Sequence, residues 1–181
     1  MLLVAGLSIT LYQGNSKFVI KPQKTETKLE VKKKSMKITS SAFENNSKIP
    51  SKYTCEDKNI NPPLEFSDTP KETKSLVLVV DDPDAPSKTW VHWVVYNIDP
   101  STARINESSV PQEALQGTTD FGKPGYEGPC PPSGTHRYFF KLYALDTILE
   151  APDGLTKQQV LEKVRDHVIE EAELVGLYSR H

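Results

Sequence analysis

The segment from Ser75 to Asp99 constrains the fold more than any other part of this 181-residue chain. It contains two short apolar runs, 76–80 and 90–98, and an acidic loop with two prolines lies between them. Short runs rich in Val, Ile and aromatic residues are typical of strands that are buried on both faces of a sheet. We therefore predict two core strands joined by a loop with three carboxylates, and His92 lies inside the second strand.

Charge divides the chain into two parts. Residues 1–37 carry eight lysines and two glutamates, a charge of +6, whereas the remainder carries 14 basic and 22 acidic residues, a charge of −8. An acidic domain argues against nucleic acid as the main partner, because neutralising phosphates requires a basic surface. We predict an apolar end and a Lys-rich flexible spacer over 1–35, followed by one domain over 36–181.

Residues 1–12 are apolar, about as long as the core of a signal peptide and too short for a membrane-spanning helix. A positively charged start and a lipid-attachment cysteine are both missing. Two interpretations therefore stay open with equal weight. The segment is an export signal or membrane anchor, or it is the apolar end of a cytoplasmic protein.

The chain has two cysteines, Cys55 and Cys130, and no pair of cysteines with the spacing of a zinc site. They form a disulfide if the protein is exported, or stay as thiols in a reducing compartment. The sequence leaves both possibilities open.

Further strands are predicted on both sides of the central segment. The run 136–145 predicts a third strong strand, and 36–40 predicts a first strand that continues through 42–43 after a bulge. The segment 61–66 contains consecutive prolines, which favour an edge strand or a polyproline conformation. Glycines and prolines crowd the segment 117–132, which predicts a long ordered loop.

One helix is predicted near the C-terminus. Thr156 and Gln159 form a capping box, and an apolar stripe at helical spacing follows them. We expect this helix to extend to Val175, with Gly176 as its C-terminal cap. His167 borders the stripe and is predicted to lie outside any functional site.

Five polar side chains lie at strand ends or beside the Gly/Pro-rich loop, where binding sites are commonly built. They are Asp82, Asp84, His92, His136 and Tyr138. Imidazoles and a phenol can donate hydrogen bonds to a small anion, while a carboxylate that accepts from an imidazole favours its cationic form. The pattern predicts a pocket for phosphate, a phosphorylated headgroup or a carboxylate.

Three alternatives to an anion pocket stay open. A metal-dependent enzyme would draw ligands from the two histidines and the carboxylates, although no H-E-x-x-H motif is present. A serine hydrolase would need a nucleophile, for which Ser133 is a weak candidate outside any G-x-S-x-G motif. In the third, the pocket is vestigial and the protein acts by surface contact alone. Our first hypothesis is a non-enzymatic protein without a cofactor or metal.

Several motifs, in the same order, resemble the phosphatidylethanolamine-binding protein family, and most closely its bacterial and archaeal branch, often called Raf kinase inhibitor-like. The matching segments are 82–86 (DPDAP), 90–93 (WVHW) and 128–138 (GPCPPSGTHRY). The resemblance covers about residues 36–178. It implies a mainly β fold, an antiparallel β-sandwich with a few peripheral helices, and one of these near the C-terminus.

The resemblance also implies a small anion pocket without strong catalysis. The positions it assigns to ligand binding are Asp82, Asp84, Pro86, Trp90, His92, Gly128, Pro131, Pro132, His136 and Tyr138, with Asp84 carried over as a structural neighbour. It further implies a cis peptide near the acidic loop.

Family members bind phospholipid headgroups or phosphate and inhibit kinases or serine proteases by contact. The implied partners are therefore a small anion, such as phosphate or a phosphoethanolamine headgroup, and a protease or kinase. Peripheral membrane contact is compatible with this interpretation, and so is either a monomer or a homodimer.

Overall fold

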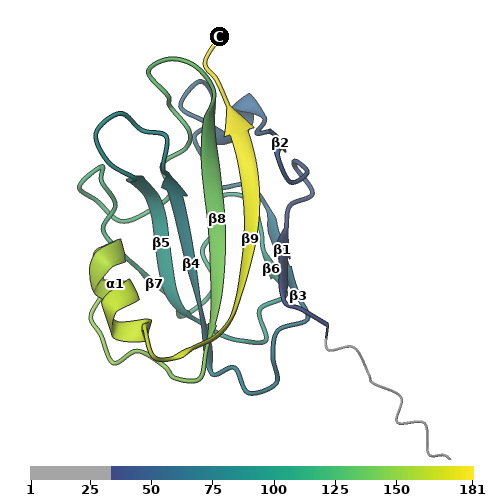
Figure 1. The fold of residues 1–181 in the computed structure, drawn as a ribbon, viewed down its shortest axis with the longest axis vertical. Helices are drawn as coiled ribbons and strands as arrows, with labels where there is room; N and C mark the ends of the chain where they lie inside the picture. The colour runs from purple at the N-terminus through teal and green to yellow at the C-terminus, as the bar shows by residue number, and fades with distance from the viewer. Residues whose placement is uncertain (1–33) are drawn as a thin grey trace, which may run out of the picture. The chain divides into compact units, whose positions relative to one another are not determined.

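The computed structural model describes residues 34–181, and the predictions for the spacer and for residues 1–12 lie outside them. Two sheets pack face to face (Figure 1). The larger sheet has six strands in the order β2-β9-β8-β4-β5-β7, and the smaller has the order β1-β3-β6. The predicted mainly β sandwich is confirmed.

The bounds of the elements follow the chain in order. They are β1 (Lys37–Thr39), β2 (Ser47–Lys48), the 3-10 turn η1 (Ser51–Tyr53), β3 (Leu64–Ser67), β4 (Ser75–Asp82), β5 (Trp90–Ile98), β6 (Arg104–Ile105), β7 (Leu115–Gln116), β8 (His136–Leu145), α1 (Lys157–Val164) and β9 (Val168–Tyr178).

The central strands β4 and β5 of the larger sheet are covered on both faces. The inner face of this sheet packs against the smaller sheet through a core that includes Leu78, Trp93 and Phe140. The outer face of the two strands is covered by α1, where Val160 and Val164 pack against Val79 and other residues of β4 and β5. All eight residues of β4 are buried, which confirms the central strand predicted from its continuous apolar run.

The predicted C-terminal helix is too long. The capping box at Thr156 is present, but α1 ends at Val164 and β9 follows from Val168. Residues 172, 174 and 178 face the inter-sheet core, so the apolar pattern there has the period of a strand. Pairing with the whole of β8, from His136–Tyr178 to Leu145–Val168, stabilises the strand over the helix.

Three smaller expectations also need correction. Of the two alternatives for 61–66, the edge strand is wrong, because β3 lies between β1 and β6, and the two prolines precede its paired residues. The first strand ends at Thr39 and does not continue through 42–43. Within residues 34–181 every peptide bond is trans, so the expected cis peptide near the acidic loop is not present. In the same range, no helix is long and apolar enough to cross a membrane.

Candidate functional site

A bulge in β5 positions His92. Val80 of β4 pairs with Trp93, whereas the next residue, Asp81, pairs with Val91, so His92 is the extra residue opposite this step. Val91 therefore packs on the helix-covered face and Trp93 in the inter-sheet core, although they are only two residues apart. A bulge of this kind redirects a side chain, and it directs His92 towards the end of the inner core.

The end of β4 and the beginning of β8 bring a carboxylate and an imidazole together. Asp82 Oδ2 lies 2.7 Å from His136 Nδ1, and the two side chains are only 4% and 9% exposed. The other oxygen, Asp82 Oδ1, accepts the backbone N–H of Asp84 at 2.8 Å. The carboxylate therefore holds a proton on Nδ1 and leaves Nε2 of His136 available to a ligand.

His92 is oriented by a backbone carbonyl instead of a carboxylate. Its Nδ1 lies 2.6 Å from the carbonyl oxygen of Glu127, whose own N–H donates to the carbonyl of His92 at 3.0 Å. Nδ1 must donate in this contact, so Nε2 is again the free nitrogen. Burial lowers the pKa of His92, which favours the neutral imidazole.

Tyr138 brings a hydroxyl group with no partner. The side chain is buried, and its oxygen makes no hydrogen bond within residues 34–181. Burial raises the pKa of Tyr138, and the nearby charge of Asp82 raises it further, so the hydroxyl keeps its proton. A buried donor without a partner is uncommon in proteins and is consistent with a group that meets a ligand or water.

These side chains line a cavity of about 390 Å³. Its lining residues are Asp82, Ala85, Pro86, Ser87, Trp90, His92, Phe121, Cys130, Pro131, Pro132, His136 and Tyr138. Eight of the ten residues assigned from sequence are therefore together at one place. The other two, Asp84 and Gly128, lie beside the cavity and support it.

Asp84 anchors the acidic loop to β8. Its carboxylate accepts from Nε and Nη2 of Arg137 at 2.9 and 2.7 Å, and also from the backbone N–H of Arg137 at 2.9 Å. The hydrogen bonds from the guanidinium lower the pKa of Asp84 to about 2. Asp84 therefore holds the loop in place, as expected for a structural neighbour of the site.

Gly128 lies where two segments approach each other closely. Its N–H donates to Asn59 Oδ1 at 2.7 Å, and a Cβ atom at this position would clash with the carbonyl of Tyr53. Cys55 and Cys130 form a disulfide next to this contact, with their Cα atoms 5.5 Å apart. The structure therefore decides between the two states of the cysteines that the sequence left open.

Phe121 is the main lining residue that was not assigned to the site from sequence. It is 41% exposed and makes edge-to-face contacts with Trp90 and His92, at centroid distances of 5.8 and 5.5 Å. The only sequence signal for it is an aromatic side chain in a polar, Gly-rich loop. Ala85, Ser87 and Cys130 also line the cavity and gave no separate signal.

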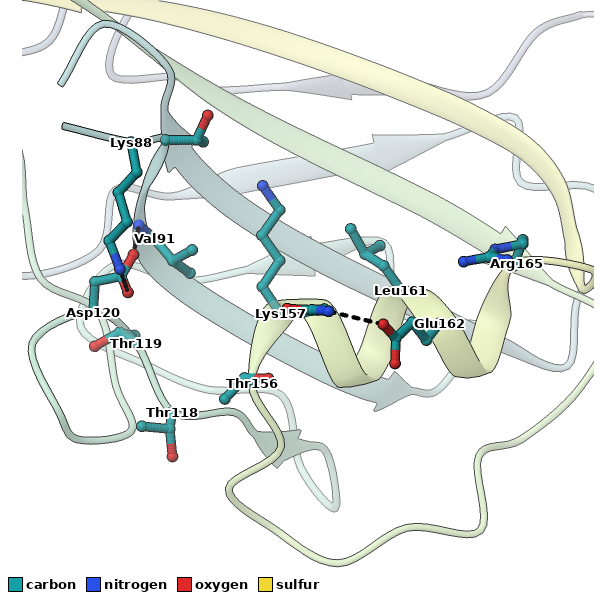
Figure 2. A pocket seen from close by; sticks show the side chains of 12 residues that line it. Lys88, Val91, Thr118, Thr119, Asp120, Thr156, Lys157, Leu161, Glu162 and Arg165 are labelled. Atoms are coloured by element: carbon teal, nitrogen blue, oxygen red, sulfur yellow. Dashed lines mark hydrogen bonds and ion pairs between the residues drawn. The ribbon is translucent and has the colours of Figure 1, made fainter. Parts of the chain in front are cut away.

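A larger cavity of about 630 Å³ lies on the helix-covered side of the sheet (Figure 2). Its charged side chains are largely paired within the protein. Lys88 Nζ lies 2.6 Å from Asp120 Oδ1, and Lys157 pairs with the buried carboxylate of Asp81. None of the ten assigned residues lines this cavity, so the chemistry predicted from sequence belongs to the smaller one. In the described range, 34–181, no group of three or more His, Cys, Asp or Glu side chains is placed to hold a metal ion.

The structure is therefore a β-sandwich with two histidines, a tyrosine and an aspartate around a small cavity at one end of the larger sheet. The family model described as phosphatidylethanolamine-binding protein matches residues 39–179. The chain therefore belongs to this family, and the resemblance seen in the motifs is confirmed.

Three relatives match this chain over nearly their whole length. A UPF0098 protein of Methanothermobacter thermautotrophicus is 51% identical over 150 residues, which cover 80% of this chain and 99% of that protein. A crystal structure described as a homologue of the family, CT736 of Chlamydia trachomatis, is 45% identical with a TM-score of 0.79, covering 81% of this chain and 99% of that one. The crystal structure of YbcL from E. coli, described as a new member of the mammalian family, is 30% identical with a TM-score of 0.77, covering 82% and 100%.

Proposed function

We propose that this protein is a non-enzymatic binding module whose 390 Å³ cavity takes a small anion, either phosphate or the phosphate of a phospholipid-type headgroup. The observation that carries the proposal is the buried Asp82–His136 pair beside His92 and the unpaired hydroxyl of Tyr138. The proposed biological role is inhibition of a protease or kinase by contact. Membership of a family described as phosphatidylethanolamine-binding supports the choice of ligand.

The hydrogen-bonding groups favour an anion as the ligand. Nδ1 of His136 is engaged by Asp82, so Nε2 is the nitrogen that can donate to an anion when it carries a proton, and the hydroxyl of Tyr138 adds a neutral donor. The carboxylate that would repel an anion is itself engaged, because both of its oxygens already accept hydrogen bonds. An anion would therefore meet Nε2 of His136 and the hydroxyl of Tyr138, with the carboxylate of Asp82 engaged behind them.

The same contacts argue against hydrolytic chemistry. A serine nucleophile needs a hydrogen bond to its general base. Ser87 lines the cavity with His136, yet its hydroxyl makes no hydrogen bond to that imidazole among the described residues. Ser133, the candidate from sequence, does not line the cavity.

The proposal is tested by adding phosphate and phosphoethanolamine while following the imidazole signals by NMR. The signals of His92 and His136 should move with a saturable dependence on ligand. His167 provides an internal control, because it is exposed and paired with Asp146 outside the cavity. If neither cavity imidazole responds at millimolar ligand, the proposed pocket is wrong.

A screen for esterase and phosphatase activity, with metal analysis of the purified protein, tests the enzymatic alternative. We expect no activity that depends on His136. Turnover by the wild type that is lost in His136→Ala, or a metal ion at one equivalent per chain, would contradict a purely binding role.

A further inference from the structure

The disulfide is at the edge of the proposed anion cavity and open to solvent. Cys130 lines the cavity, and both Cys55 and Cys130 are exposed. The two residues are 75 positions apart in the chain. The bond therefore connects one wall of the cavity to a distant loop, at a place that a reductant can reach.

The wall beyond Cys130 has few other attachments. Residues 131–135 make no hydrogen bond to any part of the described chain before β8 begins at His136. Prolines at 129, 131 and 132 have no N–H to donate, so such a segment gains little order from backbone hydrogen bonding. Pro131 and Pro132 nevertheless line the cavity, so contacts other than their own hydrogen bonds must hold them in position.

Loop 53–59 supplies that support. Tyr126 donates its hydroxyl to the carbonyl of Tyr53 at 2.9 Å, and Gly128 donates its N–H to Asn59. The last hydrogen bond before residues 130–135 is at the cysteines, where the N–H of Cys55 donates to the carbonyl of Pro129 at 3.1 Å. Between Cys130 and His136 the disulfide is the only covalent link to another segment of the described chain, and residues 131–135 add no hydrogen bond to it.

We infer that the Cys55–Cys130 disulfide is a redox control of anion binding. In the oxidised protein it holds the 130–135 wall against the cavity, and reduction releases the wall. This inference rests on the proposed anion-binding function. Exposed disulfides are the ones that exchange readily, whereas buried structural ones resist reduction.

The proposed reductant is a dithiol, and every bond, electron and proton of the exchange is accounted for. One thiolate of the dithiol attacks a sulfur of the protein, the S–S bond breaks, and a mixed disulfide forms. The second thiol of the reductant displaces the remaining protein sulfur. Cys55 and Cys130 take up two electrons and two protons as thiols, and the reductant leaves as its own disulfide.

Calorimetric titration of inorganic phosphate into oxidised protein and into protein reduced with dithiothreitol tests this inference. We expect reduction to weaken binding about tenfold, since even one released wall residue must be ordered again when the anion binds. Reoxidation should restore the affinity. The double variant Cys55→Ser/Cys130→Ser should bind like the reduced protein whether or not dithiothreitol is present.

The outcomes separate the inference from the proposed function. If the oxidised protein binds no phosphate, the proposed function fails. If it binds phosphate and reduction changes the affinity less than twofold, the redox control is wrong and the anion site remains. The far-ultraviolet circular dichroism spectrum and the His167 signal monitor the fold. Loss of both on reduction would overturn the inference, because the disulfide would then serve stability alone.

Discussion

The two cavity histidines are held by acceptors of different charge. His136 donates to the carboxylate of Asp82, whereas His92 donates to the neutral carbonyl of Glu127. A carboxylate stabilises the imidazolium form, and a carbonyl in a buried setting does so much less. Burial lowers the pKa of His92, which favours its neutral form, and binding an anion beside it favours uptake of a proton.

Anion affinity should consequently rise as the pH falls. Burial lowers the pKa of His92 below its usual value of about 6.5, so protonation in the free protein occurs below that pH. Sulfate is the appropriate probe because it does not titrate in this range. Its affinity should increase by up to about tenfold per pH unit for one proton taken up. Calorimetry in buffers of different ionisation enthalpy measures this proton directly.

His92→Asn provides the matched control, since its side-chain amide can still donate to the carbonyl of Glu127 but cannot take up a proton. The variant should show a flatter pH dependence. An unchanged slope would assign the proton to His136.

The lowered pKa of His92 also has a consequence for the stability of the fold. The unfolded chain binds the proton more readily, so the free energy of unfolding decreases as the pH falls below about 6.5.

Residue types and motif order were sufficient to predict most of the site. Asp82, His92, His136 and Tyr138 all line one cavity, as their positions at strand ends indicated. The role of Phe121 could not be predicted, because it depends on a loop folding back onto Trp90 and His92. The bulge at His92 could not be predicted from the sequence either, because it is defined only by the pairing of β5 with β4.

At the scale of elements, β9 shows how tertiary pairing overrides a local pattern. Valines at 164, 168 and 175 fit one face of a helix, but the same stretch fits a strand through residues 172, 174 and 178. Sequence periodicity does not separate the two when β-branched residues dominate. Pairing along the whole length of β8 stabilises the strand, and this partner cannot be predicted from the local sequence of β9.

Gly176→Ala tests the packing of β9. A Cβ at this position would clash with the fully buried Ile49 and lie 2.9 Å from Cε2 of Phe43. We expect overpacking to lower the free energy of unfolding by about 1–3 kcal/mol, measured by denaturant titration. Glu173→Ala, at an exposed position of the same strand, should stay within about 0.5 kcal/mol of the wild type. Equal effects of the two substitutions would contradict this account.

At the scale of the whole molecule, the described residues have their own complete core. Residues 34–181 belong to one compact unit, and the inner face of the larger sheet and the outer face of β4 and β5 are covered from within it. The predicted start of the domain near residue 36 lies close to this boundary, because the change from Lys-rich to apolar sequence marks where burial begins. Met36 is the first buried residue of the described range.

A fragment of residues 34–181 should therefore fold by itself. We expect its free energy of unfolding and its affinity for phosphate to equal those of the full chain, because a domain with a complete core is stable alone. Denaturant titration and calorimetry of both proteins check this. A decrease in unfolding free energy of more than about 1 kcal/mol, a large share of a typical domain's stability, would show that the domain extends further.

The order of strands in the larger sheet also determines when the cavity forms during folding. Val79 of β4 pairs with Val94 on one side and with Lys141 on the other, partners 15 and 62 residues away in the chain. The nearby pairing of β4 with β5 can form early, whereas the distant pairing with β8 must first close a long loop. Asp82 and His136 lie on opposite sides of that late junction. We therefore expect the cavity to form late in folding, after β4 has paired with β5.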